Sequence, residues 1–234
     1  MKNDRVLLDG KEYSLGQSGF ARRSGFKVMS GDEKSCRLTL RSGASTLQHY
    51  PFDFELEVAY RIEGSRLRIE ATVLNTGQRV MPASFGFHPA FRWPLPYGGP
   101  RDAHEIRFEQ AETEPLRPLV NGLLGPVASQ SPVDGTILRL WDDLFNEDAL
   151  VFELLASRAV EYGAPGRRLI KVAFPDMPHL GIWTKLDADF ICIEPWQGFA
   201  SPVELDGELA EKPGVVPVDP GIARRFSMEI SVSL

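Results

Sequence analysis

Residues 52–74 carry the pattern that most restricts how this chain can fold. Apolar and polar side chains alternate with a period of two on both sides of the sequence Glu63-Gly64-Ser65. The apolar positions are Phe52, Phe54, Leu56, Val58, Tyr60 and Ile62 before this turn, and Leu67, Ile69, Ala71 and Val73 after it. A period of two places alternate side chains on opposite faces of a strand, and a glycine turn between two such runs is typical of a hairpin. The pattern predicts an antiparallel hairpin with one buried face and one solvated face.

The same alternation returns elsewhere, and no long stretch has helical periodicity. It is present in residues 36–41 and again in residues 226–232. Glycines and prolines divide the remainder into short pieces and predict loops at 94–100 and 201–221, while residues 142–152 can open a short helix. Many short strands between such turns predict an all-β sandwich or barrel. A length of 234 residues fits one domain of this class, spanning residues 1–234.

Composition and motifs exclude several classes of function. The formal net charge is −6 and no dense run of Lys and Arg is present, so we expect no nucleic-acid partner. No apolar run is long enough to span a membrane, and the N-terminus lacks an apolar signal segment. The two cysteines, Cys36 and Cys192, are far apart, which fits a reducing cytoplasm. The sequence has no dinucleotide, P-loop or nucleophile-elbow motif, and its four histidines lack metal-ligand spacing, so we expect no metal and no cofactor.

Two stretches that are far apart in sequence carry the candidate chemistry. Residues 84–94 place His88 among four aromatic residues, one glycine and two prolines. Residues 190–196 place Glu194 between a near-continuous apolar run and a Pro-Trp pair. A histidine between apolar walls can exchange a proton near neutral pH, and a carboxylate there is hard to ionise without a partner. These side chains fit an acid–base pair, and the alternative for His88 is a buried histidine that binds a backbone carbonyl.

Other titratable side chains give weaker signals. His104 lies in a polar run and is expected in solvent, and His179 lies in a loop that enters a strand. A paired-carboxylate glycosidase, with Glu194 acting beside Asp148 or Asp176, stays open as an alternative but has no motif behind it.

The motifs GFHPAF and CIEPW, which contain His88 and Glu194 in this order, resemble those of the aldose 1-epimerase (galactose mutarotase-like) family. The similarity extends over most of the chain, from Gly10 to the last strand. It implies a large antiparallel β-sandwich with a sugar bound in an open groove on one sheet face. It also implies interconversion of the α and β anomers of free aldoses, with Glu194 as general base, His88 as general acid, and neither metal nor cofactor.

The resemblance also indicates which side chains contact the sugar. The sequence Gln-Ser-Gly-Phe-Ala-Arg, which ends at Arg22, has Ser18 where the family usually has a sugar-binding histidine. A serine can still hydrogen-bond a sugar hydroxyl. Arg22 is either a sugar contact or a structural arginine, and Asp148 is either the matched acidic contact or a turn residue. Phe91 and Trp183 are candidate aromatic contacts, with core packing as the alternative.

Two departures from the family pattern support a second hypothesis. Besides Ser18, the sequence begins partway into the family pattern, without its first strands and without a counterpart of its sugar-contacting arginine. The alternative function is therefore a carbohydrate-binding or regulatory protein with weak or lost catalysis. Missing strands would also leave sheet edges uncovered, which is the basis for expecting a homodimer.

Overall fold

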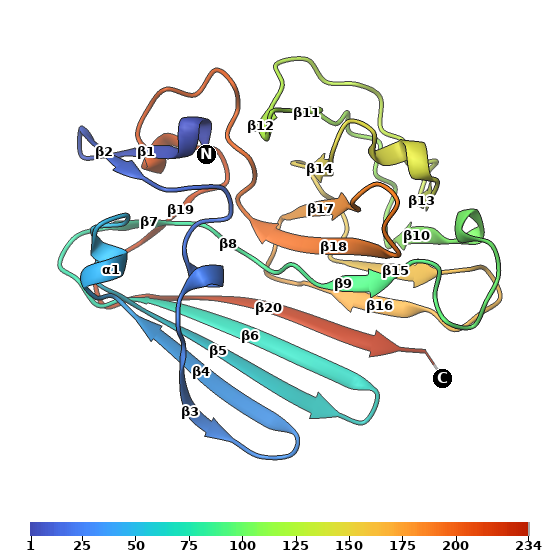
Figure 1. Cartoon of the computed structure of the whole chain (residues 1–234), viewed down its shortest axis with the longest axis horizontal. Coiled ribbons are helices and arrows are strands. Elements are labelled where there is room, and N and C mark those ends of the chain that lie inside the picture. Colours follow the sequence, from blue (N-terminus) through green and yellow to red (C-terminus); the bar gives the residue numbers. More distant parts are fainter. Residues whose placement is uncertain (234) are drawn as a thin grey trace.

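A computed structural model describes residues 1–233 and places most strands in two antiparallel sheets that pack together as a β-sandwich (Figure 1). The larger sheet has nine strands. In spatial order they are β13 (Ile137–Arg139), β10 (Glu105–Phe108), β15 (Ala159–Gly163), β16 (Ile170–Ala173), β20 (Ala223–Val232), β6 (Arg66–Asn75), β5 (Phe54–Glu63), β4 (Ser35–Arg41) and β3 (Lys27–Gly31).

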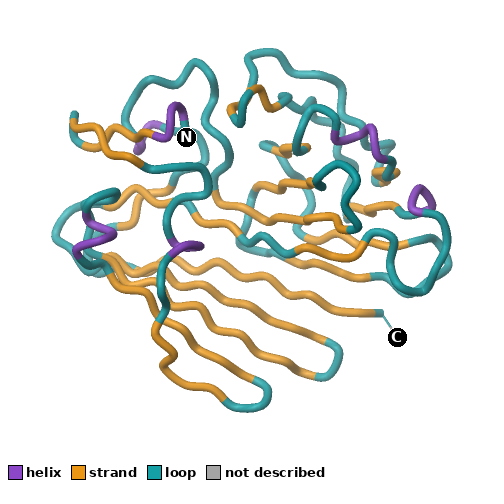
Figure 2. The backbone as a smooth tube through the Cα atoms, viewed as in Figure 1, coloured by secondary structure: helices purple, strands orange, loops and turns teal. Residues whose placement is uncertain are grey.

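The smaller sheet has five strands along which the candidate site is built. They are β14 (Leu150–Phe152), β17 (His179–Trp183), β18 (Phe190–Gln197) and β8 (Phe85–Gly86), with β9 (Ala90–Arg92) pairing to the other end of β18. Figure 2 shows that loops and short hairpins gather on the side of this sheet that faces away from the nine-stranded sheet. These hairpins are β1 (Arg5–Leu8) with β2 (Lys11–Ser14) and β11 (Leu119–Val120) with β12 (Leu123–Leu124). A further two-stranded sheet joins two segments distant in sequence, β7 (Met81–Ala83) and β19 (Val216–Val218).

The helices are short, as the absence of helical periodicity predicts. The α-helix α1 covers Ala44–Leu47, and the 3-10 helices are η1 (Lys2–Asp4), η2 (Ala21–Arg23), η3 (Arg101–Ala103), η4 (Asp142–Phe145) and η5 (Leu209–Glu211). Within residues 1–233, none of these helices has the length and apolar composition that crossing a membrane requires.

The predicted hairpin is confirmed as β5 and β6, with Glu63 opposite Arg66 across a turn at Gly64. Gly64 has φ +59°, a conformation that a residue without Cβ adopts easily. The predicted burial holds only for the half of the hairpin away from its turn, where the inward-facing residues Phe54, Leu56, Val58, Ile69, Ala71 and Val73 are buried. Near the turn, Tyr60 and Ile62 are 37% and 49% exposed. The ends of β3 to β6 on this side extend past the smaller sheet (Figure 1).

The outer edge of the large sheet is formed by β3, and all five of its residues are exposed. Within residues 1–233 its only pairing partner is β4. An open edge of this kind can pair with another chain. A second subunit that covers this edge stays a prediction.

Two expectations were wrong. His104 is 1% exposed, because its ring stacks on Tyr97 and its Nε2 accepts a hydrogen bond from the Leu95 backbone N–H at 3.0 Å. The sequence predicted an exposed side chain because the neighbours of His104 in sequence are polar. Residues 201–221 are also more than a surface loop, since they contain η5 and the strand β19, which pairs with β7.

We predict that His104 makes the fold sensitive to acid. Burial lowers the pKa of His104 below its usual 6.5, so the unfolded chain takes up this proton first as the pH falls below 6.5. The folded state therefore loses stability on acidification. His104→Gln keeps a hydrogen-bond acceptor but removes this titration, and we expect its free energy of unfolding to fall less between pH 7 and 5, by at most about 1.4 kcal/mol per pH unit. Urea unfolding of both proteins across this range tests it, and equal slopes would contradict it.

Candidate active site

The candidate residues lie on one face of the smaller sheet, the face opposite to its contact with the nine-stranded sheet, because of the register between β17 and β18. Gly181 lies opposite Glu194, and Trp183 lies opposite Cys192, so all four share one face. The alternate residues on the other face are buried in the cluster that joins the two sheets: Leu180, Ile182, Ile191 and Ile193. The near-continuous apolar run before Glu194 is therefore a strand that is buried on both faces.

His88 reaches Glu194 from the segment between β8 and β9. The Phe87 backbone N–H donates to the Pro195 carbonyl at 3.0 Å, and the Ile193 N–H donates to the Pro89 carbonyl at 3.3 Å. These bonds hold the chain to β18 on both sides of His88. They place His88 Nδ1 3.5 Å from Glu194 Oε1, with 48% of the His88 side chain but only 6% of the Glu194 side chain exposed. The two stretches that the sequence singled out therefore meet.

The environment of this pair opposes ionisation of both groups. Burial raises the pKa of Glu194 to about 8, assisted by the nearby Asp148 carboxylate and opposed by a hydrogen bond from the Trp196 side chain and by the Arg22 charge. Burial, with a smaller contribution from Arg22, lowers the pKa of His88. Near neutral pH the pair therefore holds one proton, mainly on Glu194, and the two groups titrate as a unit.

Cys192 is the third group in this cluster that can bind a metal. The ligand atoms of His88, Cys192 and Glu194 all lie within 4.8 Å of one another. However, burial raises the pKa of the Cys192 thiol to about 12, so the protein holds it protonated, whereas a metal binds the thiolate. The donor set therefore suits proton exchange between His88 and Glu194 better than a resident ion.

Three predicted substrate contacts lie around the pair. Arg22, in η2, is close enough to influence the pKa values of both groups. Asp148 occupies a turn at φ 76° before β14, where its carboxylate accepts the Ala149 N–H at 2.8 Å, and its charge acts on Glu194. The Trp183 ring meets the His88 ring edge to face at 6.4 Å. Asp148 therefore has the turn role, and its contact with a sugar stays a prediction.

The other two predicted contacts are placed differently. Ser18 is exposed and lies in a turn at φ 62°. Within residues 1–233, no hydrogen bond joins Ser18 to His88 or Glu194. Phe91 pairs with Ile191 across β9 and β18, so its side chain lies on the opposite face from Glu194 and packs against the core beside Tyr162. For Phe91 the geometry favours core packing.

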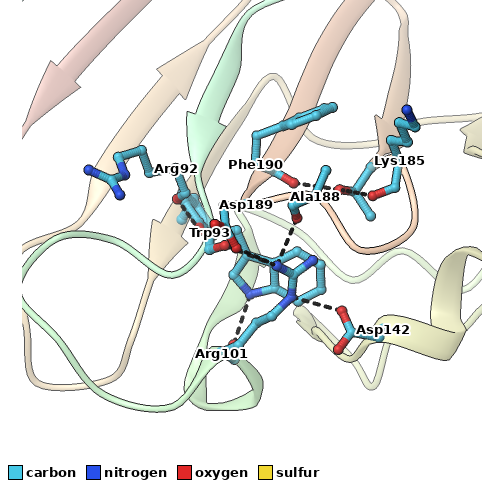
Figure 3. Close-up of polar contacts among 10 residues, drawn as sticks. Arg92, Trp93, Arg101, Asp142, Lys185, Ala188, Asp189 and Phe190 are labelled. Atoms are coloured by element: carbon cyan, nitrogen blue, oxygen red, sulfur yellow. Dashed lines mark hydrogen bonds and ion pairs between the residues drawn. The ribbon is translucent and has the colours of Figure 1, made fainter.

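Arg101 fixes the hairpin loop that joins Trp183 to β18 (Figure 3). Its guanidinium carbon lies 3.8 Å from the centre of the Trp93 ring, and its Nη1 donates to the carbonyls of Trp93 at 3.1 Å and Ala188 at 2.8 Å. Its Nε also pairs with Asp142 at 2.8 Å. These contacts of Arg101 join the segment after β9 to the loop between β17 and β18.

Two strand glycines that the sequence analysis did not single out also belong to the site. Gly86 and Gly181 both lie against the Trp196 ring. A glycine inside a strand often marks the close approach of another group, and that signal was present in both strands.

Comparison with known proteins agrees with this arrangement of sheets. The protein-family model described as aldose 1-epimerase matches residues 1–230. The chain is 31% identical over 236 residues to the chromosomal protein LacX of Lactococcus lactis subsp. lactis, covering 98% of this chain and 78% of LacX. The crystal structure of a galactose mutarotase related enzyme from Lactobacillus acidophilus matches with a TM-score of 0.92 and 31% identity, covering 100% of this chain and 79% of the other.

A galactose mutarotase-like protein from Lactobacillus casei has the same fold, with a TM-score of 0.89 at 24% identity, covering 99% of this chain and 81% of the other. The fold is thus that of the galactose mutarotase-like β-sandwich proteins. The chain belongs to the aldose 1-epimerase family.

We predict that Glu194 reduces the stability of the folded protein at neutral and alkaline pH. Its pKa is raised from 4.5 to about 8, so ionisation favours the unfolded chain increasingly as the pH rises between these values. Glu194→Gln keeps the shape and removes the ionisation. We expect the variant to match the wild type near pH 4 and to gain on the order of a few kcal/mol by pH 8. Thermal unfolding at both pH values tests this, and an advantage that is independent of pH would contradict it.

Proposed function

We propose that this protein is an aldose 1-epimerase that interconverts the α and β anomers of a free aldose. The observation that carries the proposal is the contact of 3.5 Å between Glu194 Oε1 and Nδ1 of the half-exposed His88. Ring opening of a cyclic sugar needs one group to remove the proton of the anomeric hydroxyl and another to protonate the ring oxygen. The hydroxyl oxygen and the ring oxygen are bonded to the same carbon. Two proton-exchanging side chains this close together can serve both atoms.

The reaction begins from the less populated form of the pair, in which the shared proton is on His88 and Glu194 is ionised. Glu194 accepts the proton of the anomeric hydroxyl, His88 donates its proton to the ring oxygen, and the bond between C1 and the ring oxygen breaks to leave an open-chain aldehyde. Rotation about the C1–C2 bond turns the other aldehyde face toward the C5 hydroxyl. On closure His88 takes the proton from that hydroxyl and Glu194 returns its proton to the former carbonyl oxygen. Each transfer can contribute about 10²- to 10⁴-fold.

The surrounding residues support this assignment. The Arg22 charge favours the ionised form of Glu194 that the first step requires, and its exposed position leaves it free to contact a sugar hydroxyl. The partly buried Trp183 ring beside His88 offers an apolar surface for a sugar ring. The sugar is therefore the small-molecule partner that we propose.

Polarimetry of freshly dissolved α-glucose and α-galactose tests the activity. We expect the protein to accelerate the approach to anomeric equilibrium, and Glu194→Gln to reduce the protein-dependent rate by about 10²- to 10⁴-fold. A matched control is Glu147→Gln, which makes the same change at an exposed position and is expected to keep the wild-type rate.

The second candidate function is a sugar-binding protein without efficient catalysis, which the serine at position 18 favours. The same samples distinguish it. A sugar that changes tryptophan fluorescence without any acceleration of mutarotation would support binding alone and contradict the epimerase proposal.

A further inference from the structure

Arg101 is a largely buried cation at a place where three segments of the chain meet. Its side chain is 20% exposed, and its guanidinium carbon lies 3.8 Å from the centre of the fully buried Trp93 ring. Its Nη1 donates to the carbonyls of Trp93, after β9, and of Ala188, in the loop between β17 and β18. Its Nε lies 2.8 Å from Asp142 Oδ1, in η4. A buried charge costs free energy unless partners surround it, and these partners come from three separate segments.

The contact with Ala188 acts on the end of the hairpin that carries Trp183 (Figure 3). Trp183 is the last residue of β17, and its ring centre lies 5.8 Å from that of Phe190 and 6.4 Å from that of His88. Strand ends open locally more readily than strand centres. The hydrogen bond from Arg101 to the Ala188 carbonyl closes this end of the hairpin and thereby limits the movement of the Trp183 ring.

The contact with Asp142 acts on the turn that carries Asp148. Asp142 is the first residue of η4, and Phe145, the last, packs edge to face on Trp93 at 6.1 Å. The Asp148 backbone N–H then donates to the Phe145 carbonyl at 3.1 Å. Arg101 and Trp93 therefore hold both ends of η4, from which the chain enters the Asp148 turn.

An arginine suits this junction better than a lysine. The flat guanidinium stacks on the Trp93 ring while the N–H groups at its edge reach acceptors in different directions. A lysine ammonium is a single point of charge on a flexible stem, and it cannot stack on the ring and reach all of these acceptors at once.

We propose that Arg101 is a positioning residue, which holds the Trp183 ring and the Asp148 turn in place around His88 and Glu194. It acts through the hairpin loop and through η4 rather than on the reacting atoms. The inference rests on the proposed function in one respect, namely that a sugar binds among these residues. The position of the Trp183 ring can be measured without any sugar.

Fluorine NMR of protein labelled with fluorotryptophan tests this position. The chain has four tryptophans, and Trp183→Phe identifies the signal of Trp183. Arg101→Lys keeps the charge but not the flat group, and we expect it to shift or broaden the Trp183 signal. Arg61→Lys is the matched control, because Arg61 also pairs with a carboxylate, that of Glu63 at 2.6 Å, but lies on β5 of the large sheet. It should leave the Trp183 signal unchanged.

Mutarotation kinetics separate positioning from a loss of stability. We expect Arg101→Lys to lower kcat/KM by about 10- to 100-fold, mostly through a higher KM, because the role proposed for Trp183 and Asp148 is binding. Partial unfolding would instead lower kcat with the folded fraction and leave KM unchanged. Arg61→Lys should keep both constants. If Arg101→Lys does not fold, Asp142→Asn removes one charged partner of Arg101 and makes the same test with a smaller expected effect.

The results separate the two proposals. An unchanged Trp183 signal in Arg101→Lys, or a KM equal to that of the wild type, would overturn the role of Arg101. A displaced Trp183 signal, together with a wild-type protein that does not accelerate mutarotation, would keep the role of Arg101 at Trp183 and reject the epimerase function instead.

Discussion

The burial of one carboxyl group, that of Glu194, is the constraint on which the rest of the site depends. Ionising a carboxyl group in an apolar setting costs free energy, and the pKa of Glu194 is therefore raised to about 8. Two neighbours moderate this effect, since the Trp196 side chain and Arg22 favour the ionised form, whereas Asp148 adds to it. The group is thereby kept close to the point at which it can both accept and return a proton near neutral pH.

The smaller sheet fixes the positions of the groups around Glu194. The register between β17 and β18 fixes which residues share the face of Glu194. Backbone hydrogen bonds between β18 and the segment that joins β8 to β9 fix His88 beside it. The opposite face of the same strands is sealed against the nine-stranded sheet. A strand that packs against the core with one face and carries a largely buried carboxyl group on the other gives a rigid base for an acid–base pair.

The sequence predicted much of this architecture because its signals are local. The alternation in residues 52–74 yields β5 and β6, and the surroundings of His88 and Glu194 in sequence already indicate apolar walls. The sequence could not predict contacts that depend on the three-dimensional fold. His104 is buried by Tyr97 and Leu95, although its own sequence neighbours are polar.

The face to which Phe91 points follows from its pairing with Ile191 on another strand, which no local pattern specifies. The glycines beneath Trp196 could have been suspected, because glycine inside a strand indicates close approach, but the partner becomes visible only in three dimensions.

The dependence of the mutarotation rate on pH tests the central claim most directly. If His88 and Glu194 work as a pair that must hold one proton, kcat/KM should be constant over an intermediate range. It should fall on the acid side as His88, whose pKa lies below 6.5, and Glu194 are both protonated, and on the alkaline side near pH 8 as the shared proton is lost. A rate that instead rises once, with a midpoint near the ordinary glutamate value of about 4.3, and stays level into alkaline solution would contradict the account.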